Sequence, residues 1–368
     1  MRYTLLKFLR DQLSTPPPLH THVYNLTNKT IVITGANTGL GFEAAKHFAR
    51  MKPGKVVLAC RNMGKAERAA ERIRTETGFE RVQVRLLDQA DFASVKSFAK
   101  EFSEREERLD VLVANAGVAR DVYEGTKDGW ETTLQTNHLS SALLSLLLLP
   151  KMLATARNHP KATKPCISIV SSETHYFGKF TEPALQSGNL LETLGSEEYC
   201  RTQSMAMHAR YTETKLLNIF FTRALAAHIS SLPPSPSKDP SISASAPPVL
   251  VNAVNPGLCL SSIHTHISNP LISRMYRLIE PLLARSTEVG GRALVWGALG
   301  RGHEGDYLGD GTHRKYINGW QVEEVSDYVL RNRELEQRIW RETVEILGRV
   351  QPGLREMYLP GGEDLEAL

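Results

Sequence analysis

The chain has few cysteines, no long hydrophobic run and little net charge, and each absence excludes a class of protein. The four cysteines in 368 residues are widely separated and form no C-x-x-C pair, which favours reduced thiols in a cytoplasmic protein over a disulfide framework. The longest apolar run, residues 139–150, is too short to span a bilayer and predicts a buried helix. A net charge of only +4 argues against a nucleic-acid partner.

Catalytic motifs of two hydrolase classes are also missing. The sequence contains neither G-x-S-x-G nor H-E-x-x-H, so it gives no support to a hydrolase function. The histidines of segment 264–266 have no carboxylate or cysteine partner at a suitable spacing. We therefore predict no metal site.

Three segments outside the main pattern have their own composition. Residues 1–28 are an N-terminal extension, in which residues 1–18 carry leucines interrupted by charges and end in prolines. They predict a short amphipathic helix that either docks on the protein or makes weak membrane-surface contact through residues 1–14. Residues 232–248 predict a flexible Pro/Ser-rich loop within a domain spanning 29–350, and residues 351–368 predict a loose acidic tail.

Short apolar runs alternate with longer helical patterns through the first 260 residues. This alternation is typical of an α/β fold in which helices cover both faces of a parallel sheet. The predicted strands are 30–34, 55–59, 82–87, 109–114, 166–170 and 249–254. The predicted helices are 40–51, 63–76, 91–106, 128–149 and 211–229, followed by an amphipathic helix at 333–348.

A glycine-rich turn follows the first predicted strand. The stretch "TGANTGLG", residues 34–41, leads directly into a helix. Glycines there permit a tight turn and let backbone N–H groups approach a pyrophosphate at the positive end of the helix. The predicted phosphate-binding residues are Gly35, Asn37, Thr38, Gly39, Leu40 and Gly41.

The end of the second predicted strand is where a dinucleotide's ribose is read. An acidic side chain there would bind the 2′-hydroxyl of NAD, whereas this sequence has Cys60 followed by Arg61. A guanidinium suits a 2′-phosphate, so Arg61 predicts NADP(H), with Lys65 adding positive potential. The alternative is that Arg61 is simply a surface residue at a strand end.

Tyr211 and Lys215 lie four residues apart in a predicted helix and therefore share one face. Alone, the pair is more often a partly buried tyrosine beside a solvated lysine. Together with other segments, however, it resembles the short-chain dehydrogenase/reductase family, in particular its retinol-dehydrogenase-like branch of fungal type. The matching segments, in the family's order over roughly residues 28–300, are the glycine turn, "LLD" ending at 88, "NAG" at 115–117, "LQTNHLS" around 137, "VSS" at 170–172, "YTETK" at 211–215 and "NPG" at 255–257.

The resemblance implies a Rossmann-type doubly wound sheet and a nicotinamide cofactor. It also implies a catalytic tetrad of Asn137, Ser172, Tyr211 and Lys215. In it the tyrosine would move the proton, the lysine would favour phenolate and bind the nicotinamide ribose, the serine would hold the substrate oxygen, and the asparagine would hold a relay water. Asn137 could at the same time bind backbone at a helix irregularity. By the same resemblance, Asp88 would meet the adenine and Asn115 would steady the central strands.

The lysine can supply the free energy needed to lower the pKa of the tyrosine. A phenol titrates near pH 10, and lowering this to about 7 requires roughly 4 kcal/mol. An ammonium about 4 Å away supplies roughly that at an effective dielectric near 20. Tyrosine and lysine one helical turn apart thus suit proton transfer.

The sequence therefore predicts an NADP(H)-dependent enzyme that interconverts an alcohol and a ketone or aldehyde on an apolar small molecule, with fungal secondary metabolism as a suggested setting. The alternative is an NADP-binding regulatory or sensor protein without turnover. The substrate pocket is expected within 173–210 and 258–288, where Ser261 or Ser262 replaces the family's threonine near the cofactor amide. Its predicted lining is Tyr176, Phe177, Phe180, Leu258, Ile263 and Met275.

Overall fold

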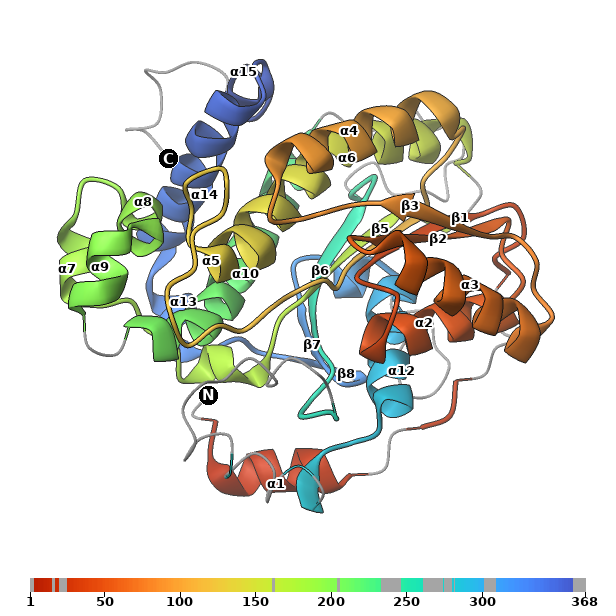
Figure 1. The fold of residues 1–368 in the computed structure, drawn as a ribbon, viewed down its shortest axis with the longest axis horizontal. Coiled ribbons are helices and arrows are strands. Elements are labelled where there is room, and N and C mark those ends of the chain that lie inside the picture. Colours follow the sequence, from red (N-terminus) through yellow and green to blue (C-terminus); the bar gives the residue numbers. More distant parts are fainter. Residues whose placement is uncertain are drawn as a thin grey trace.

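The computed structural model describes residues 3–14, 17–19, 25–160, 163–203, 206–232, 246–260, 274, 280, 282–300 and 309–359. Its centre is an eight-stranded sheet with the strand order β3-β2-β1-β4-β5-β6-β7-β8 (Figure 1). All neighbouring strands are parallel except β7 and β8. The strands are β1 Thr30–Thr34, β2 Lys55–Cys60, β3 Val82–Leu86, β4 Val111–Ala114, β5 Cys166–Val170, β6 Leu250–Asn255, β7 Tyr316–Asn318 and β8 Gln321–Glu323.

Alternation along the strands divides the interior into two cores. On β1, Val32 belongs to the core on one face of the sheet, whereas Ile31 and Ile33 belong to the core on the other face. This follows from the two-residue period of a strand, and because both faces are covered, the strands are apolar throughout. The prediction of a Rossmann-type α/β fold is confirmed.

Helices cover both faces of the sheet (Figure 1). The helices α2, α3 and α12 contribute to one core, and α4, α6, α10 and α14 contribute to the other. Their bounds are α2 Gly39–Arg50, α3 Met63–Thr77, α4 Phe92–Arg105, α6 Ser140–Asn158, α10 Ala206–Ser231, α12 Thr287–Leu299 and α14 Arg333–Val350. Shorter helices are α5 Thr132–Leu134, α7 Glu182–Gln186, α8 Leu190–Gly195, α9 Glu197–Thr202, α13 Asp327–Arg331 and α15 Leu354–Tyr358, with short irregular turns η2 Gln135–Leu139, η3 Glu173–Tyr176 and η5 Gly309–Thr312.

The continuous helical stretch Thr132–Asn158 is long and apolar enough to cross a membrane by length and composition. Of its most apolar window, 67% is buried inside the protein. It includes η2 and α6, and α6 packs against α4. The predicted buried helix at 139–150 is therefore confirmed as an element of the core.

Two predictions about the C-terminal region need correction. The sequence pattern did not predict β7 and β8, which are only three residues long each and extend the sheet beyond β6. The predicted loose tail begins with α15, whose Leu354 and Tyr358 are buried, because the apolar side chains of a short amphipathic turn pack on α14. The Pro/Ser-rich loop lies almost entirely outside the described residues.

The predicted N-terminal amphipathic helix is α1, Leu5–Leu13. Thr4 caps its first turn, and the helix lies beside the segment that leads into α12 (Figure 1). Lys7 on α1 pairs with Glu323 on β8 at 2.8 Å. Of the two alternatives, docking on the protein is therefore observed for this helix.

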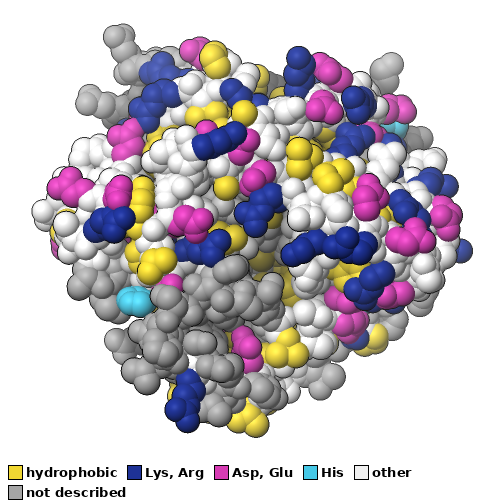
Figure 2. Space-filling view, viewed as in Figure 1, with side chains coloured by type: hydrophobic (Ala, Val, Ile, Leu, Met, Phe, Trp, Pro, Cys, Tyr) yellow, Lys and Arg dark blue, Asp and Glu magenta, His cyan; other side chains and the backbone are white. Residues whose placement is uncertain are grey.

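Charges of both signs are interspersed on the face of the molecule shown in Figure 2. Lys and Arg side chains alternate there with Asp and Glu side chains over the described surface. This distribution agrees with the small net charge of +4.

Candidate active site

A cavity of about 660 Å³ opens at the carboxyl ends of the central parallel strands. The residues that follow β1, β2, β4, β5 and β6 all line it, since these strand ends meet at one edge of the sheet. Of the residues predicted for the site, the cavity is lined by Gly35, Asn37, Thr38, Gly39, Leu40, Arg61, Asp88, Asn115, Ser172, Tyr211 and Lys215.

The glycine-rich turn lies at one end of this cavity. Gly35 and Gly39 have φ of +66° and +62°, a conformation that favours glycine. Thr38 is the N-cap of α2 but makes no side-chain capping bond, so the first N–H groups of the helix are not satisfied by their cap. A turn of this kind at a helix N-terminus suits a phosphate group.

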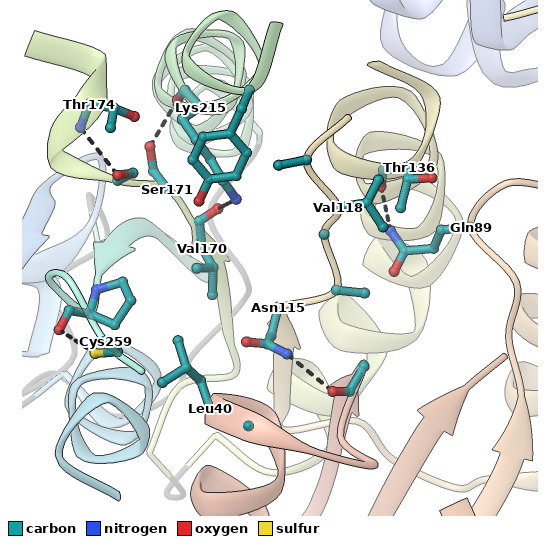
Figure 3. Close-up of a pocket in the computed structure, with 18 of the residues that line it drawn as sticks. Leu40, Gln89, Asn115, Val118, Thr136, Val170, Ser171, Thr174, Lys215 and Cys259 are labelled. Carbon is teal, nitrogen blue, oxygen red and sulfur yellow. Dashed lines mark hydrogen bonds between the residues drawn. The ribbon is translucent and has the colours of Figure 1, made fainter. Parts of the chain in front are cut away.

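Gly41 is needed for packing and does not line the cavity. A Cβ atom at this position would lie 2.6 Å from Asn115 Nδ2 and 2.8 Å from Gly35 O. Asn115 donates from Nδ2 to Thr34 O at 2.8 Å, and Thr34 Oγ1 accepts from the backbone N–H groups of Asn115 and Ala116. Asn115 thus ties the end of β4 to the end of β1 (Figure 3).

The ribose end has a cation but no anion at the end of β2. Arg61 is exposed and lines the cavity, whereas Lys65 on the first turn of α3 does not. Burial raises the pKa of the Cys60 thiol to about 11, so this side chain carries no charge at neutral pH. Asp88 lies after β3, where its Oδ1 accepts from Ala90 N at 3.0 Å.

Tyr211 and Lys215 lie one turn apart on α10, as the spacing predicts. The Lys215 Nζ atom is 5.4 Å from the centroid of the Tyr211 ring and donates to Val170 O at 3.0 Å (Figure 3). Burial lowers the pKa of Lys215 to about 8. The side chain therefore remains mainly protonated at neutral pH, although it is almost completely removed from solvent.

The two serines after β5 have different surroundings. Ser171 Oγ donates to Lys215 O at 2.8 Å and so holds α10 against the strand end. Ser172 Oγ accepts from Thr174 N at 3.2 Å as the N-cap of η3, and its hydroxyl also bonds to the neighbouring Glu173 carboxyl at the cavity wall. This difference agrees with the choice of Ser172 over Ser171 as the substrate-binding serine.

Asn137 lies behind the cavity wall. It belongs to η2, a π-helical turn, and its amide pairs with both backbone groups of Val118 at 2.8 Å. Its Nδ2 also donates to Thr214 Oγ1 at 3.1 Å. The backbone-binding alternative is thus observed. A Cβ at Gly117 would lie 3.2 Å from Asn137 Oδ1 and 3.7 Å from Lys215 Nζ, so the missing side chain leaves room between them.

The aromatic residues predicted for the substrate pocket are placed elsewhere. Phe180 packs in the core near Phe220 and Tyr328, Phe177 is exposed, and Tyr176 donates to Glu324 O at 2.6 Å. Hydrophobicity alone could not separate core and pocket side chains. Ile263, Met275, Ser261 and Ser262 lie outside the described residues, as does segment 264–266, and no group of three metal-ligating side chains occurs among the residues described.

Further residues line the end of the cavity that we assign to the substrate. From the predicted stretches 173–210 and 258–288 these are Glu173, Thr174, Met207, His208, Leu258 and Cys259, of which Leu258 was predicted by name. The lining residues outside those stretches are Val118, Ala119, Arg120, Asp121 and Thr212. Met207 and His208 precede Tyr211 by four and three residues on α10, so helical spacing could have identified them. Glu173 directly follows Ser172, but its carboxylate gave no signal in the sequence pattern.

The sheet and the side chains at its carboxyl edge together define a class of protein. A parallel sheet with a glycine turn after β1, and a tyrosine and a lysine over the ends of the same strands, is the arrangement of a Rossmann-type oxidoreductase. A family model described as short chain dehydrogenase matches residues 29–174. This chain belongs to the short-chain dehydrogenase/reductase family.

Relatives cover nearly the whole chain. Short-chain dehydrogenase anuD of Penicillium roqueforti is 33% identical, over 96% of this chain and 86% of the relative. Short chain dehydrogenase/reductase dmxR8 of Cryptosporiopsis sp. is 32% identical, over 95% of this chain and 99% of the relative. Human retinol dehydrogenase 12 is 33% identical, over 88% and 87%. The predicted retinol-dehydrogenase-like branch is confirmed.

Solved structures share the fold. A putative uncharacterized protein from Mycobacterium paratuberculosis has a TM-score of 0.59 and 25% identity, covering 88% of this chain and 94% of that one. A short chain dehydrogenase from Shigella flexneri, solved in complex with NADP, has a TM-score of 0.53 and 21% identity, covering 81% and 99%.

Proposed function

We propose that this oxidoreductase uses NADP(H) to interconvert an alcohol and a ketone or aldehyde on a small, mainly apolar molecule. The observation that carries the proposal is the convergence of Ser172, Tyr211 and Lys215 on the cavity that also contains the glycine turn. A sensor protein without turnover would not need this set of proton-handling groups.

The residues divide the chemistry as follows. The nicotinamide, when bound, supplies or takes up the hydride. In the direction of reduction, the Tyr211 hydroxyl donates a proton to the carbonyl oxygen; in oxidation, its phenolate accepts the proton of the alcohol. The Ser172 hydroxyl donates a hydrogen bond to the same oxygen and holds it beside the phenol.

Lys215 stabilises the phenolate form of Tyr211. Its ammonium lies on the same side of α10 as the Tyr211 ring, and buried charges interact more strongly than exposed ones. The Val170 carbonyl fixes the Nζ atom, so the ammonium needs little rearrangement during proton transfer. Asn137 and Gly117 leave room beside Lys215 where a relay water could bind.

The proposal of NADP(H) rests on the end of β2. Arg61 lines the cavity, and the neighbouring Cys60 carries no negative charge that would repel a phosphate. A 2′-phosphate would therefore find a guanidinium and no carboxylate at this position. The four residues Val118, Ala119, Met207 and Leu258 give the substrate end an apolar part, which favours a mainly apolar substrate.

The test is turnover. Purified protein is incubated with NADPH or NADH and a panel of carbonyl compounds that ranges from long-chain and polycyclic ketones to polyols. We expect NADPH oxidation with apolar ketones. Tight NADPH binding without turnover of any panel member would favour the sensor alternative, and a preference for polyols would contradict the apolar substrate.

A further inference from the structure

The N-terminal helix α1 contains a glutamine that is buried against the active-site cavity wall. Gln12 is 6% exposed although it lies on a nine-residue surface helix. Its Nε2 donates to Leu258 O at 2.6 Å and to Leu283 O at 2.7 Å, and its Oε1 accepts from Leu258 N at 3.2 Å. The side-chain amide thus pairs with both backbone groups of Leu258.

Leu258 belongs to the wall of the cavity. It follows Gly257, and both residues line the cavity together with Cys259. Gly257 has φ of +80°, and a Cβ there would lie 3.1 Å from Gln12 Oε1. The same Leu258 O also accepts from Arg285 N at 2.9 Å. The wall segment is therefore held between Gln12 and the chain that leads into α12.

A second chain of contacts joins α1 to the same wall. Asn318 on β7 donates to Asp11 Oδ2 at 3.1 Å and accepts at Oδ1 from Asn255 at 2.8 Å. Asn255 Oδ1 in turn accepts from Gly257 N at 3.0 Å. Asp11 and Gln12 thus reach the turn after β6 by two independent routes.

Tyr3, two residues before α1, also contacts the segment that follows Ser172. The ring of Tyr3 stacks on the ring of Tyr176 with centroids 4.4 Å apart and an interplanar angle of 4°. Tyr176 belongs to η3, which is capped by Ser172. Residues 3–13 therefore contact both segments that bound the substrate end of the cavity, through Tyr3 at one end and Gln12 at the other.

We propose that α1 is a structural part of the substrate site and that Gln12 is a positioning residue that fixes Leu258 and Gly257 in the cavity wall. This role rests on the proposed function only in the kinetic experiment, which requires turnover of a ketone. It assigns a role to the N-terminal extension that the sequence pattern left open between docking and membrane contact.

The helix offers its own control positions. Leu6 and Leu13 are 78% and 67% exposed, and by helical spacing they lie on other faces of α1 than Gln12. Changing Leu6 alters the same helix without touching the contacts of Gln12. Gln12→Glu keeps the shape of the side chain but cannot donate to the carbonyls of Leu258 and Leu283.

The experiment compares Gln12→Ala, Gln12→Glu and Leu6→Ala with the wild type, using NADPH and the best ketone of the panel. We expect both Gln12 variants to raise the KM for the ketone about tenfold, the effect of one to two lost hydrogen bonds. Because the hydrogen bonds of the Gln12 side chain go to Leu258 and Leu283 and not to the nucleotide-binding turn, the Kd for NADPH should change less than threefold. Leu6→Ala should match the wild type in both.

A readout that needs no turnover accompanies the kinetics. Hydrogen–deuterium exchange of the peptide containing residues 257–260 should accelerate in both Gln12 variants and stay unchanged in Leu6→Ala. Unchanged KM and unchanged exchange in a folded Gln12→Ala protein would overturn the proposal. If Gln12→Ala does not fold, Tyr3→Ala replaces it, and the same outcome there would overturn the proposal. If the wild-type protein turned over no ketone of the panel but residues 257–260 still exchanged faster in the Gln12 variants, the proposed function alone would be overturned.

Discussion

The two ends of the cavity are built in different ways. The nucleotide end comes largely from one stretch of chain, residues 30–61, in which β1, a turn, α2 and β2 follow one another. The substrate end combines segments from across the sequence, including residues 118–121, 173–174, 207–212 and 258–259, with Gln12 behind the wall. A contiguous nucleotide site can stay constant while the substrate end changes through separate segments, which suits a family that keeps one cofactor chemistry and varies its substrates.

The proton-transfer residue lies where the two ends meet, and its loss should have the largest effect. Tyr211→Phe should lower kcat by about 10²–10⁴-fold, because the phenol moves the proton. NADPH affinity should stay within a few-fold, since the ring remains. Steady-state kinetics and fluorescence titration measure both quantities.

Tyr199→Phe is the matched control. It removes a buried hydroxyl that bonds to Thr181 at 2.6 Å but lies outside the cavity lining, so turnover should be retained. A Tyr211→Phe enzyme with more than a tenth of the wild-type kcat would show that another group moves the proton.

The burial of the Lys215 ammonium, where the two ends of the cavity meet, should lower the free energy of unfolding. The folded pKa of about 8 lies below the ordinary value of 10.5, which corresponds to roughly 3 kcal/mol of destabilisation at pH 7. Lys215→Met should reduce turnover by about 100-fold, because the phenolate of Tyr211 loses the ammonium that stabilises it. It should also raise the apoenzyme Tm by about 2–4 °C once the lost hydrogen bond to Val170 is allowed for.

The pH dependence has a defined sign. Between pH 8 and 10.5 the unfolded lysine binds a proton that the folded one has lost, so wild-type stability rises with pH and the gap to Lys215→Met closes. Thermal unfolding from pH 7 to 10 measures it. Lys179→Met, at an exposed lysine, should show no such closing. A gap that stays constant with pH would mean that Lys215 is not destabilised by burial.

The same contrast explains what the sequence could predict. The order of β1 to β6, the glycine turn and the Tyr211/Lys215 pair depend on short-range patterns, and the structure places them as predicted. Gln12 depends on contacts with residues that are distant in sequence, so no local pattern marks it. Glu173 lies in the predicted stretch 173–210, but no pattern singled out its carboxyl. Phe180 was misplaced because an apolar side chain after a strand fits the core as well as a pocket.

Arg61 tests the nucleotide end by itself. A charge-assisted hydrogen bond is worth roughly 1.5–3 kcal/mol, or about 10- to 150-fold in affinity. Arg61→Ala should weaken NADPH by that factor and leave NADH nearly unchanged. The KM values for both cofactors measure this preference.

Lys65→Ala is the control for Arg61, because Lys65 lies one turn further along and outside the cavity lining. We expect less than a threefold change there. Equal KM values for the two cofactors in the wild type would contradict NADP(H) preference, and a mutant that loses NADH as severely as NADPH would show that Arg61 does not read the phosphate.

Glu173 gives the smallest predicted effect, at the substrate end. Burial is the main cause that raises the pKa of this carboxyl. The positive charge of Arg285 and hydrogen bonds from the side chains of Asn255 and Ser172 oppose this rise in part. The other titratable groups around the carboxyl are Cys259, Tyr3 and Tyr316. The folded form therefore holds its proton at pH values where the unfolded form has lost it, and folded stability falls as pH rises through this interval.

Glu173→Gln, which mimics the protonated acid, should equal the wild type in Tm at pH 4 and exceed it by a few degrees at pH 8. Glu104→Gln, at an exposed position on α4, should show no such divergence. If the two substitutions gave the same pH profile, the carboxyl beside Ser172 would be solvated in the folded protein, and the substrate end of the cavity would be more polar than its packing indicates.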